Sequence, residues 1–69
     1  MTKEYYYVTV QGVTGYGKGY IGLEPGGTPV IMSVPIMFKL EHMADYVIER
    51  FTGNHGGVAT KHSVKIYMP

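Results

Sequence analysis

Cysteine and tryptophan are absent from this 69-residue chain, and charged residues are scarce. Without cysteine, disulfide bonds and thiolate metal sites are excluded. Charged side chains make up 16% of the chain, below the usual share of about 25%, and six Lys and Arg face five Asp and Glu. Proteins held on nucleic acid by its phosphates normally carry clustered basic residues. The charge balance therefore argues against that class.

Long hydrophobic runs are also missing. No stretch approaches the ~18 apolar residues of a membrane span, and tyrosines follow Met1–Glu4 where a signal peptide would have an apolar core. We therefore expect a cytoplasmic protein with no membrane contact, formed by a single domain over residues 1–69. A chain of this size has a small core and needs good packing or self-association for stability.

The spacing of apolar residues predicts one amphipathic helix from Pro35 to Phe51, because they recur at i, i+3, i+4 and i+7. Pro35 suits a first helical turn, and Gly53 and Asn54 suit a helix end. The predicted core stripe consists of Ile36, Met37, Leu40, Met43, Ala44, Val47, Ile48 and Phe51.

Alternating residues predict strands around this helix. The expected strands are Tyr5–Val13, Tyr20–Glu24 and Ser63–Tyr67, with Val30–Ser33 either a short strand or an extended lead into the helix, and Asn54–Lys61 a loop. The fold class is therefore α+β: a small antiparallel sheet of three to four strands with one helix on one face (β-β-(β)-α-β).

One helix covers only one face of a sheet, so the other face is expected to stay open. The residues predicted to face the helix are Val8, Val10, Val64, Ile66 and Met68. Those predicted for the open face are Tyr5, Tyr7 and Tyr67, with Tyr20 as a further candidate. An aromatic, weakly charged face of this kind predicts a surface for self-association or for a partner.

The stretch from Gly12 to Gly19 nearly spells the phosphate-binding loop pattern G-x-x-x-x-G-K-[ST]. Gly19 stands where a hydroxyl residue is needed, and the glycines and proline that follow allow no helix. A glycine-rich hairpin turn is the better interpretation. Backbone N–H groups here remain an alternative small-anion site, formed by Gly15, Gly17, Lys18 and Gly19.

The outward face of the predicted helix carries an aromatic line at i, i+4 and i+8, formed by Phe38, His42 and Tyr46. Asp45 and Glu49 run beside it. Aromatic anchors with a charged rim are typical of protein interfaces, so these five residues are a predicted partner-binding surface. The alternative is that Phe38 packs under a loop and that Tyr46 is an ordinary exposed aromatic.

No catalytic or metal-binding pattern is present. The three histidines and nearby acids match no metal-ligand spacing on one element, and neither Ser33 nor Ser63 lies in a nucleophile motif. We therefore expect no enzyme activity, no cofactor and no metal. The alternatives to protein binding are a small ligand or nucleotide at the glycine loop and a single-stranded nucleic acid on the tyrosine face.

The order of the YYYVTV strand, the glycine hairpin, the helix ending in FTGN and the SVKIY strand resembles the short single-domain β-β-α-β proteins of phage and prophage accessory regions. Asn54–Lys61 and Pro25–Pro29 are longer than in the leanest of them. The resemblance implies a small inhibitor or adaptor that binds and blocks a host protein, including anti-phage defence proteins. Together with the aromatic surfaces, it predicts occlusion of a partner by a homodimer or small homo-oligomer.

Overall fold

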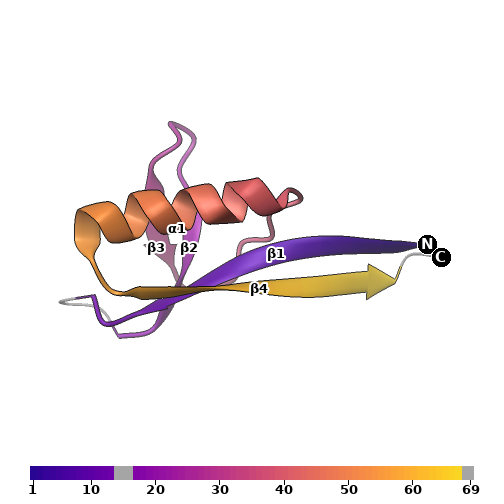
Figure 1. The fold of residues 1–69 in the computed structure, drawn as a ribbon, viewed down its shortest axis with the longest axis horizontal. Helices are drawn as coiled ribbons and strands as arrows, with labels where there is room; N and C mark the ends of the chain where they lie inside the picture. The colour runs from indigo at the N-terminus through magenta and orange to yellow at the C-terminus, as the bar shows by residue number, and fades with distance from the viewer. Residues whose placement is uncertain (14–16, 68–69) are drawn as a thin grey trace.

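The computed structural model describes residues 1–13 and 17–67. Within these ranges the chain forms a four-stranded antiparallel sheet and one helix, which confirms the predicted α+β class. The elements are β1 (Thr2–Gln11), β2 (Gly19–Leu23), β3 (Pro29–Met32), α1 (Glu41–His55) and β4 (Val58–Tyr67). The strand order is β3-β2-β1-β4, so α1 carries the chain from one edge of the sheet to the other (Figure 1).

The longest pairing joins the first and last strands. β1 and β4 pair antiparallel from Thr2 opposite Tyr67 to Gln11 opposite Val58. At one end this pair continues past α1 as a two-stranded arm, and the start of β1 and the end of β4 lie at its tip (Figure 1). Most of the arm therefore has no helix over it.

The residues between β2 and β3 form a tight hairpin turn. The Glu24 N–H donates to the Thr28 carbonyl (3.0 Å), and the Gly27 N–H donates to the Glu24 carbonyl (2.8 Å). This is the break expected at Pro25–Pro29, and the segment after it is a strand rather than only an extended lead.

The core lies between α1 and one face of the sheet. Its fully buried aliphatic members come from three elements, with Val8 on β1, Ile21 on β2 and Val47 on α1. The buried set is Val8, Val10, Val13, Ile21, Phe38, Ala44, Val47 and Phe51. The predicted inward side of β1 and the second half of the predicted helix stripe therefore form the core.

The predicted start of the helix is wrong. The helix begins at Glu41, because residue Phe38 pairs with β1 as an isolated bridge. The Tyr6 N–H donates to the Phe38 carbonyl (2.9 Å), and the Phe38 N–H donates to the Tyr6 carbonyl (2.7 Å). These bonds hold the chain extended, so Met37 and Leu40 are 43% and 54% exposed while Phe38 is buried.

The predicted loop Asn54–Lys61 is also wrong over most of its length. The helix continues to His55, and β4 begins at Val58 after only Gly56 and Gly57. Gly57 has a φ of +85°, and a Cβ there would lie 2.9 Å from the Gln11 carbonyl oxygen. Glycine therefore permits this close passage, which brings β4 alongside β1 from its first residue.

The predicted direction of β4 side chains is reversed. Lys61 lies opposite Val8 and Ser63 lies opposite Tyr6, and directly paired residues of antiparallel strands point to the same face. The odd-numbered residues of β4 therefore face the α1 side. Val64 and Ile66 point to the other face, and Met68 lies outside the described residues.

Residues 1–13 and 17–67 contain no helix that is long and apolar enough to cross a membrane.

The position of Phe38 can be tested by a matched pair of truncations. Phe38→Ala should lower the free energy of unfolding by about 3–5 kcal/mol, because it leaves a cavity in the core. Leu40→Ala, two residues later and more than half exposed, should change it by less than about 0.5 kcal/mol. Urea unfolding followed by circular dichroism measures both. Equal losses would contradict the observed helix start.

Candidate binding surface

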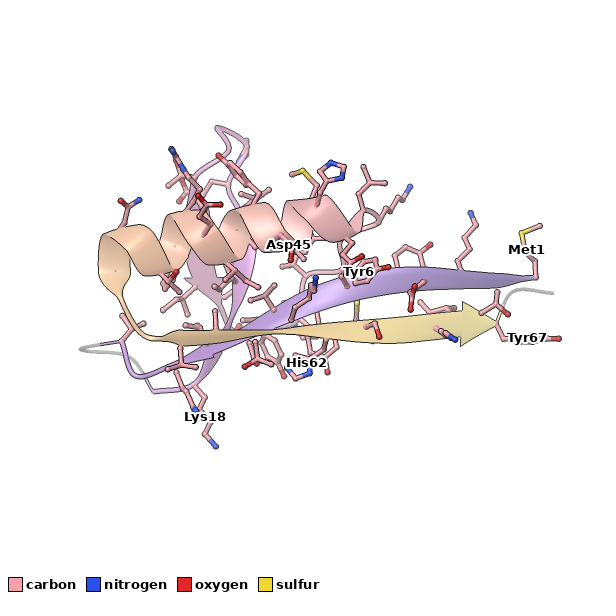
Figure 2. All side chains as sticks on the ribbon, in the orientation of Figure 1. Met1, Tyr6, Lys18, Asp45, His62 and Tyr67 are labelled. Carbon is pink, nitrogen blue, oxygen red and sulfur yellow. The ribbon has the colours of Figure 1, made fainter. Side chains whose placement is uncertain are left out.

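The face of the sheet that points away from α1, here called the open face, carries an aromatic cluster. Tyr7 alternates with the buried Val8 of β1 and therefore points away from the core. The pairing places His62 directly opposite Tyr7 and Tyr20 opposite Thr9. Figure 2 shows His62 and Lys18 on this side of the sheet, and Tyr6 and Asp45 on the α1 side.

The Tyr7 ring contacts the rings of both His62 and Tyr20. The Tyr7 and His62 ring centroids are 4.7 Å apart with an interplanar angle of 14°, so the two rings are stacked. The Tyr7 and Tyr20 centroids are 6.2 Å apart with an angle of 57°. The Thr9 Oγ1 lies 2.9 Å from the His62 Nε2, within hydrogen-bond distance. Neighbours from β4 and β2 therefore flank the Tyr7 ring.

An open groove of about 590 Å³ runs beside the cluster. It lies where β1, β2 and β4 meet, at the end of the sheet that is far from the arm. Its lining residues are Thr9, Val10, Gln11, Lys18, Gly19, Tyr20, Ser33, Val58, Thr60 and His62.

Part of the same face is covered by the chain itself. Gly22 points away from the core, and a Cβ there would lie 2.8 Å from the Ile36 Cγ1. The segment that follows β3 therefore packs closely on β2, and it leaves the β1–β4 part of the face open.

The charges are divided between the two sides of the sheet. Lys3 alternates onto the open face and Lys18 lies beside the groove. Four of the five acids lie on the α1 side, on β1 or on α1, and Glu24 lies in the β2–β3 turn. The open face is therefore mildly cationic. The four acids on the α1 side are Glu4, Glu41, Asp45 and Glu49.

Two of these acids connect the helix to β4. The Lys61 Nζ lies 2.7 Å from the Glu41 Oε2 and 2.8 Å from the Asp45 Oδ1. Hydrogen bonds from Lys61 to Asp45 and to Glu41 raise the pKa of the Lys61 ammonium above its ordinary value. The contacts are partly exposed, so their contribution to stability is small, but they orient the start of α1 over β4.

The predicted helix surface is only partly brought together. Phe38 is buried in the core beside β1, so it is not part of an exposed aromatic line with His42 and Tyr46. His42, Tyr46 and Glu49 are exposed on α1, and Asp45 is exposed but bonded to Lys61. The Arg50 guanidinium carbon lies 5.8 Å from the centre of the Tyr46 ring.

The predicted tyrosine set is split. Tyr5 and Tyr7 lie on the open face, but Tyr67 pairs with Thr2 and therefore points to the α1 side, where it is 83% exposed at the end of the arm. Tyr20, the further candidate, lies on the open face.

The predicted anion site is not assembled as a glycine nest in the part that the structure describes. Gly19 is the first residue of β2 and pairs with Val10, so it belongs to the sheet. Gly17 and Lys18 precede it, and Gly15 lies outside the described residues. A strand, not a helix, follows Lys18, whereas a phosphate-binding loop needs a helix directly after its lysine. Nor do residues 1–13 and 17–67 hold a group of three His, Asp or Glu placed to bind a metal ion.

His62 is the open-face residue that the sequence reasoning missed. The signal was present, since Val58, Thr60, His62, Val64 and Ile66 alternate along one side of a strand. Beginning the strand at Ser63 cut off the part of the pattern that contains His62.

Comparison of the chain with known protein families, curated proteins and solved structures finds no match. The resemblance to phage accessory proteins therefore remains a prediction from the order of elements.

The Tyr6–Glu4 contact on the α1 side gives a pH prediction. The Tyr6 hydroxyl donates to the Glu4 Oε1 (2.9 Å), and this hydrogen bond raises the pKa of Tyr6 above its ordinary 10.0. A raised folded-state pKa favours the neutral phenol, so this stabilisation is present below pH 10 and is lost as the pH rises through the folded value. In Glu4→Ala the pKa of Tyr6 should fall towards 10.

Titration of ¹³C-labelled tyrosine by NMR measures this change for Tyr6 alone. Thr2→Ala, on the same face of β1, is the control and should leave the Tyr6 titration where it is in the unmodified chain. An unchanged Tyr6 titration in Glu4→Ala would contradict the assignment.

Proposed function

We propose that this chain is a non-enzymatic protein-binding module that acts as an inhibitor or adaptor by covering part of a partner protein with its open face. The observation that carries the proposal is the contacting cluster of Tyr7, Tyr20 and His62 on the side of the sheet opposite α1. Rigid aromatic side chains with polar tips are common anchors in protein interfaces.

The ring arrangement favours a protein over single-stranded nucleic acid. Proteins that bind single strands stack successive bases on exposed aromatic faces. Here the His62 ring stacks on Tyr7, and Tyr20 flanks Tyr7 on the β2 side. A contact at Tyr7 is therefore made mainly through its outer edge and hydroxyl, which suits hydrogen bonds and apolar contacts from another protein.

The charge distribution favours a partner surface with an apolar centre and an acidic rim. Lys3 and Lys18 lie at opposite ends of the open β1–β4 surface, and the acids of β1 and α1 lie on the other side. Complementary charge speeds association and selects orientation. A host protein of this chemistry, including a defence protein, is the partner that the resemblance to phage proteins implies.

The groove gives a specific reason to keep small-ligand binding as the second candidate. Its volume of about 590 Å³ falls in the usual range for ligand sites, and Lys18 at its rim could pair with an anion. Addition of ATP followed by amide NMR distinguishes the two. Saturable shifts confined to Lys18, Gly19 and Tyr20 would favour the ligand.

Photo-crosslinking in bacterial cells tests the proposed surface. A benzophenone amino acid at Tyr5 or Tyr20 should crosslink to protein, whereas the same residue at the exposed Tyr46 of α1 should not. Nuclease-sensitive products from Tyr5 would contradict the proposal in favour of nucleic acid. Stronger crosslinks from Tyr46 would move the contact to the helix.

Binding measured with the purified partner then provides the energetic test. Tyr7→Ala should weaken binding about 30-fold or more, equivalent to about 2 kcal/mol, while Tyr46→Ala leaves it unchanged. Lys18→Glu should slow association most at low salt, and Arg50→Glu, at an exposed position of α1, is its control. Circular dichroism confirms that each variant is folded.

A further inference from the structure

The outer edge of β4 has no strand beside it in the described part of the chain. β4 is ten residues long and pairs only with β1, whereas the opposite edge strand, β3, has four residues and begins with Pro29. Short strands and prolines protect sheet edges from further pairing. The β3 edge has both of these protections and the β4 edge has neither.

The backbone groups that point out of this edge can be identified. Tyr6 exchanges both backbone hydrogen bonds with Phe38 on the side of β1 away from β4. Tyr6 and Ser63 are therefore a non-hydrogen-bonded pair, and the alternation of an antiparallel ladder turns the N–H and C=O groups of Ser63 outward. By the same alternation, those of Ala59, Lys61 and Lys65 also point to the free edge.

We propose that two copies of this chain pair antiparallel along β4, with the two-fold axis at His62. A two-fold axis that joins antiparallel strands is perpendicular to the sheet, so each open-face residue lies opposite another open-face residue. The axis must then lie between one residue and the same residue of the second copy. An axis between two successive residues would pair side chains that point to opposite faces. This inference goes beyond the proposed function, because it concerns the edge of β4 and not the partner of the open face.

The axis can lie at any of three central residues of β4, and the lysine pairs that each choice creates distinguish between them. An axis at Lys61 places the two Lys61 side chains opposite each other, and an axis at Ser63 places Lys61 opposite Lys65. Like charges directly opposite are destabilising in a sheet. An axis at His62 places Lys61 opposite Ser63 and Lys65 opposite Ala59, so no two lysines are paired.

The same register covers apolar surface that the single chain exposes. It places Val58 opposite Ile66, which are 62% and 38% exposed, and Thr60 opposite Val64. Both pairs lie on the open face. The two His62 rings come next to each other at the centre, so the Tyr7 clusters of both copies join into one continuous surface.

The first test is the mass of the unmodified chain in solution. Sedimentation or light scattering at high micromolar concentration should give about twice the monomer mass of 7.7 kDa. Ser63→Pro removes an N–H that points to the free edge, where proline is tolerated, and should give a folded monomer. A monomeric unmodified chain at the highest concentration would overturn the proposal.

Single cysteines test the register, because the chain has none of its own. On the proposed two-fold axis, His62 and its copy form a non-hydrogen-bonded pair. The two Cα atoms of such a pair are about 4.5 Å apart, within the range for a disulfide. His62→Cys should therefore form a covalent dimer on mild oxidation. Thr60→Cys should not, because its own copies lie about 13 Å apart along the strands.

A mixture of two variants provides a test that leaves His62 in place. Thr60→Cys and Val64→Cys lie opposite each other in the proposed register, so the mixture should form a disulfide-linked heterodimer that neither variant forms alone. Covalent dimers of Lys61→Cys or Ser63→Cys, in place of these, would overturn the register.

Discussion

The pair of backbone hydrogen bonds between Tyr6 and Phe38 fixes two features on which the rest of the structure depends, the start of the helix and the orientation of the β4 backbone. It holds the chain extended up to Leu40, so the helix begins at Glu41 and Phe38 turns into the core. It also occupies the side of Tyr6 that faces away from β4. The same two bonds therefore set the phase of α1 and the direction in which the β4 backbone groups point.

The two faces of the sheet carry different side chains. The α1 face carries the aliphatic core and most of the acids, and Lys61 is held there by Glu41 and Asp45. The open face carries the rings of Tyr7, Tyr20 and His62, with Lys3 and Lys18 at its two ends. Each side chain of a strand contributes to one face only, because successive side chains alternate between the two sides of the sheet.

The sequence was informative where a pattern had both periodicity and length. The stripe through Ala44, Val47 and Phe51 and the alternation around Val8 correctly predicted the core and the open positions of Tyr5 and Tyr7. Residues before the helix were harder to predict, because apolar side chains from Ile36 to Leu40 fit a helical period as well as a crossing segment. The long-range pairing of Phe38 with Tyr6 makes this segment extended rather than helical. No pattern within the segment itself indicates that pairing.

The error in β4 had a different physical origin. Val64 and Ile66 are apolar, and the prediction assumed that apolar residues of a strand face the helix. In the structure the register instead places Lys61 on the helix side, where acids of α1 satisfy its charge. The alternation was correct but its direction was not, so Tyr67 was assigned to the wrong face. His62 was missed for a separate reason, because the predicted strand began only at Ser63.

The alternation of β4 also links the two proposed interactions. Even-numbered residues such as His62 present side chains to the open face, while odd-numbered residues such as Ser63 present backbone groups to the free edge. In the two proposals, a protein partner would contact the first set through side chains, and a second copy would engage the second set through main-chain bonds. One strand can therefore extend a sheet and enlarge a binding surface at the same time, since the two interactions use perpendicular directions of the same backbone.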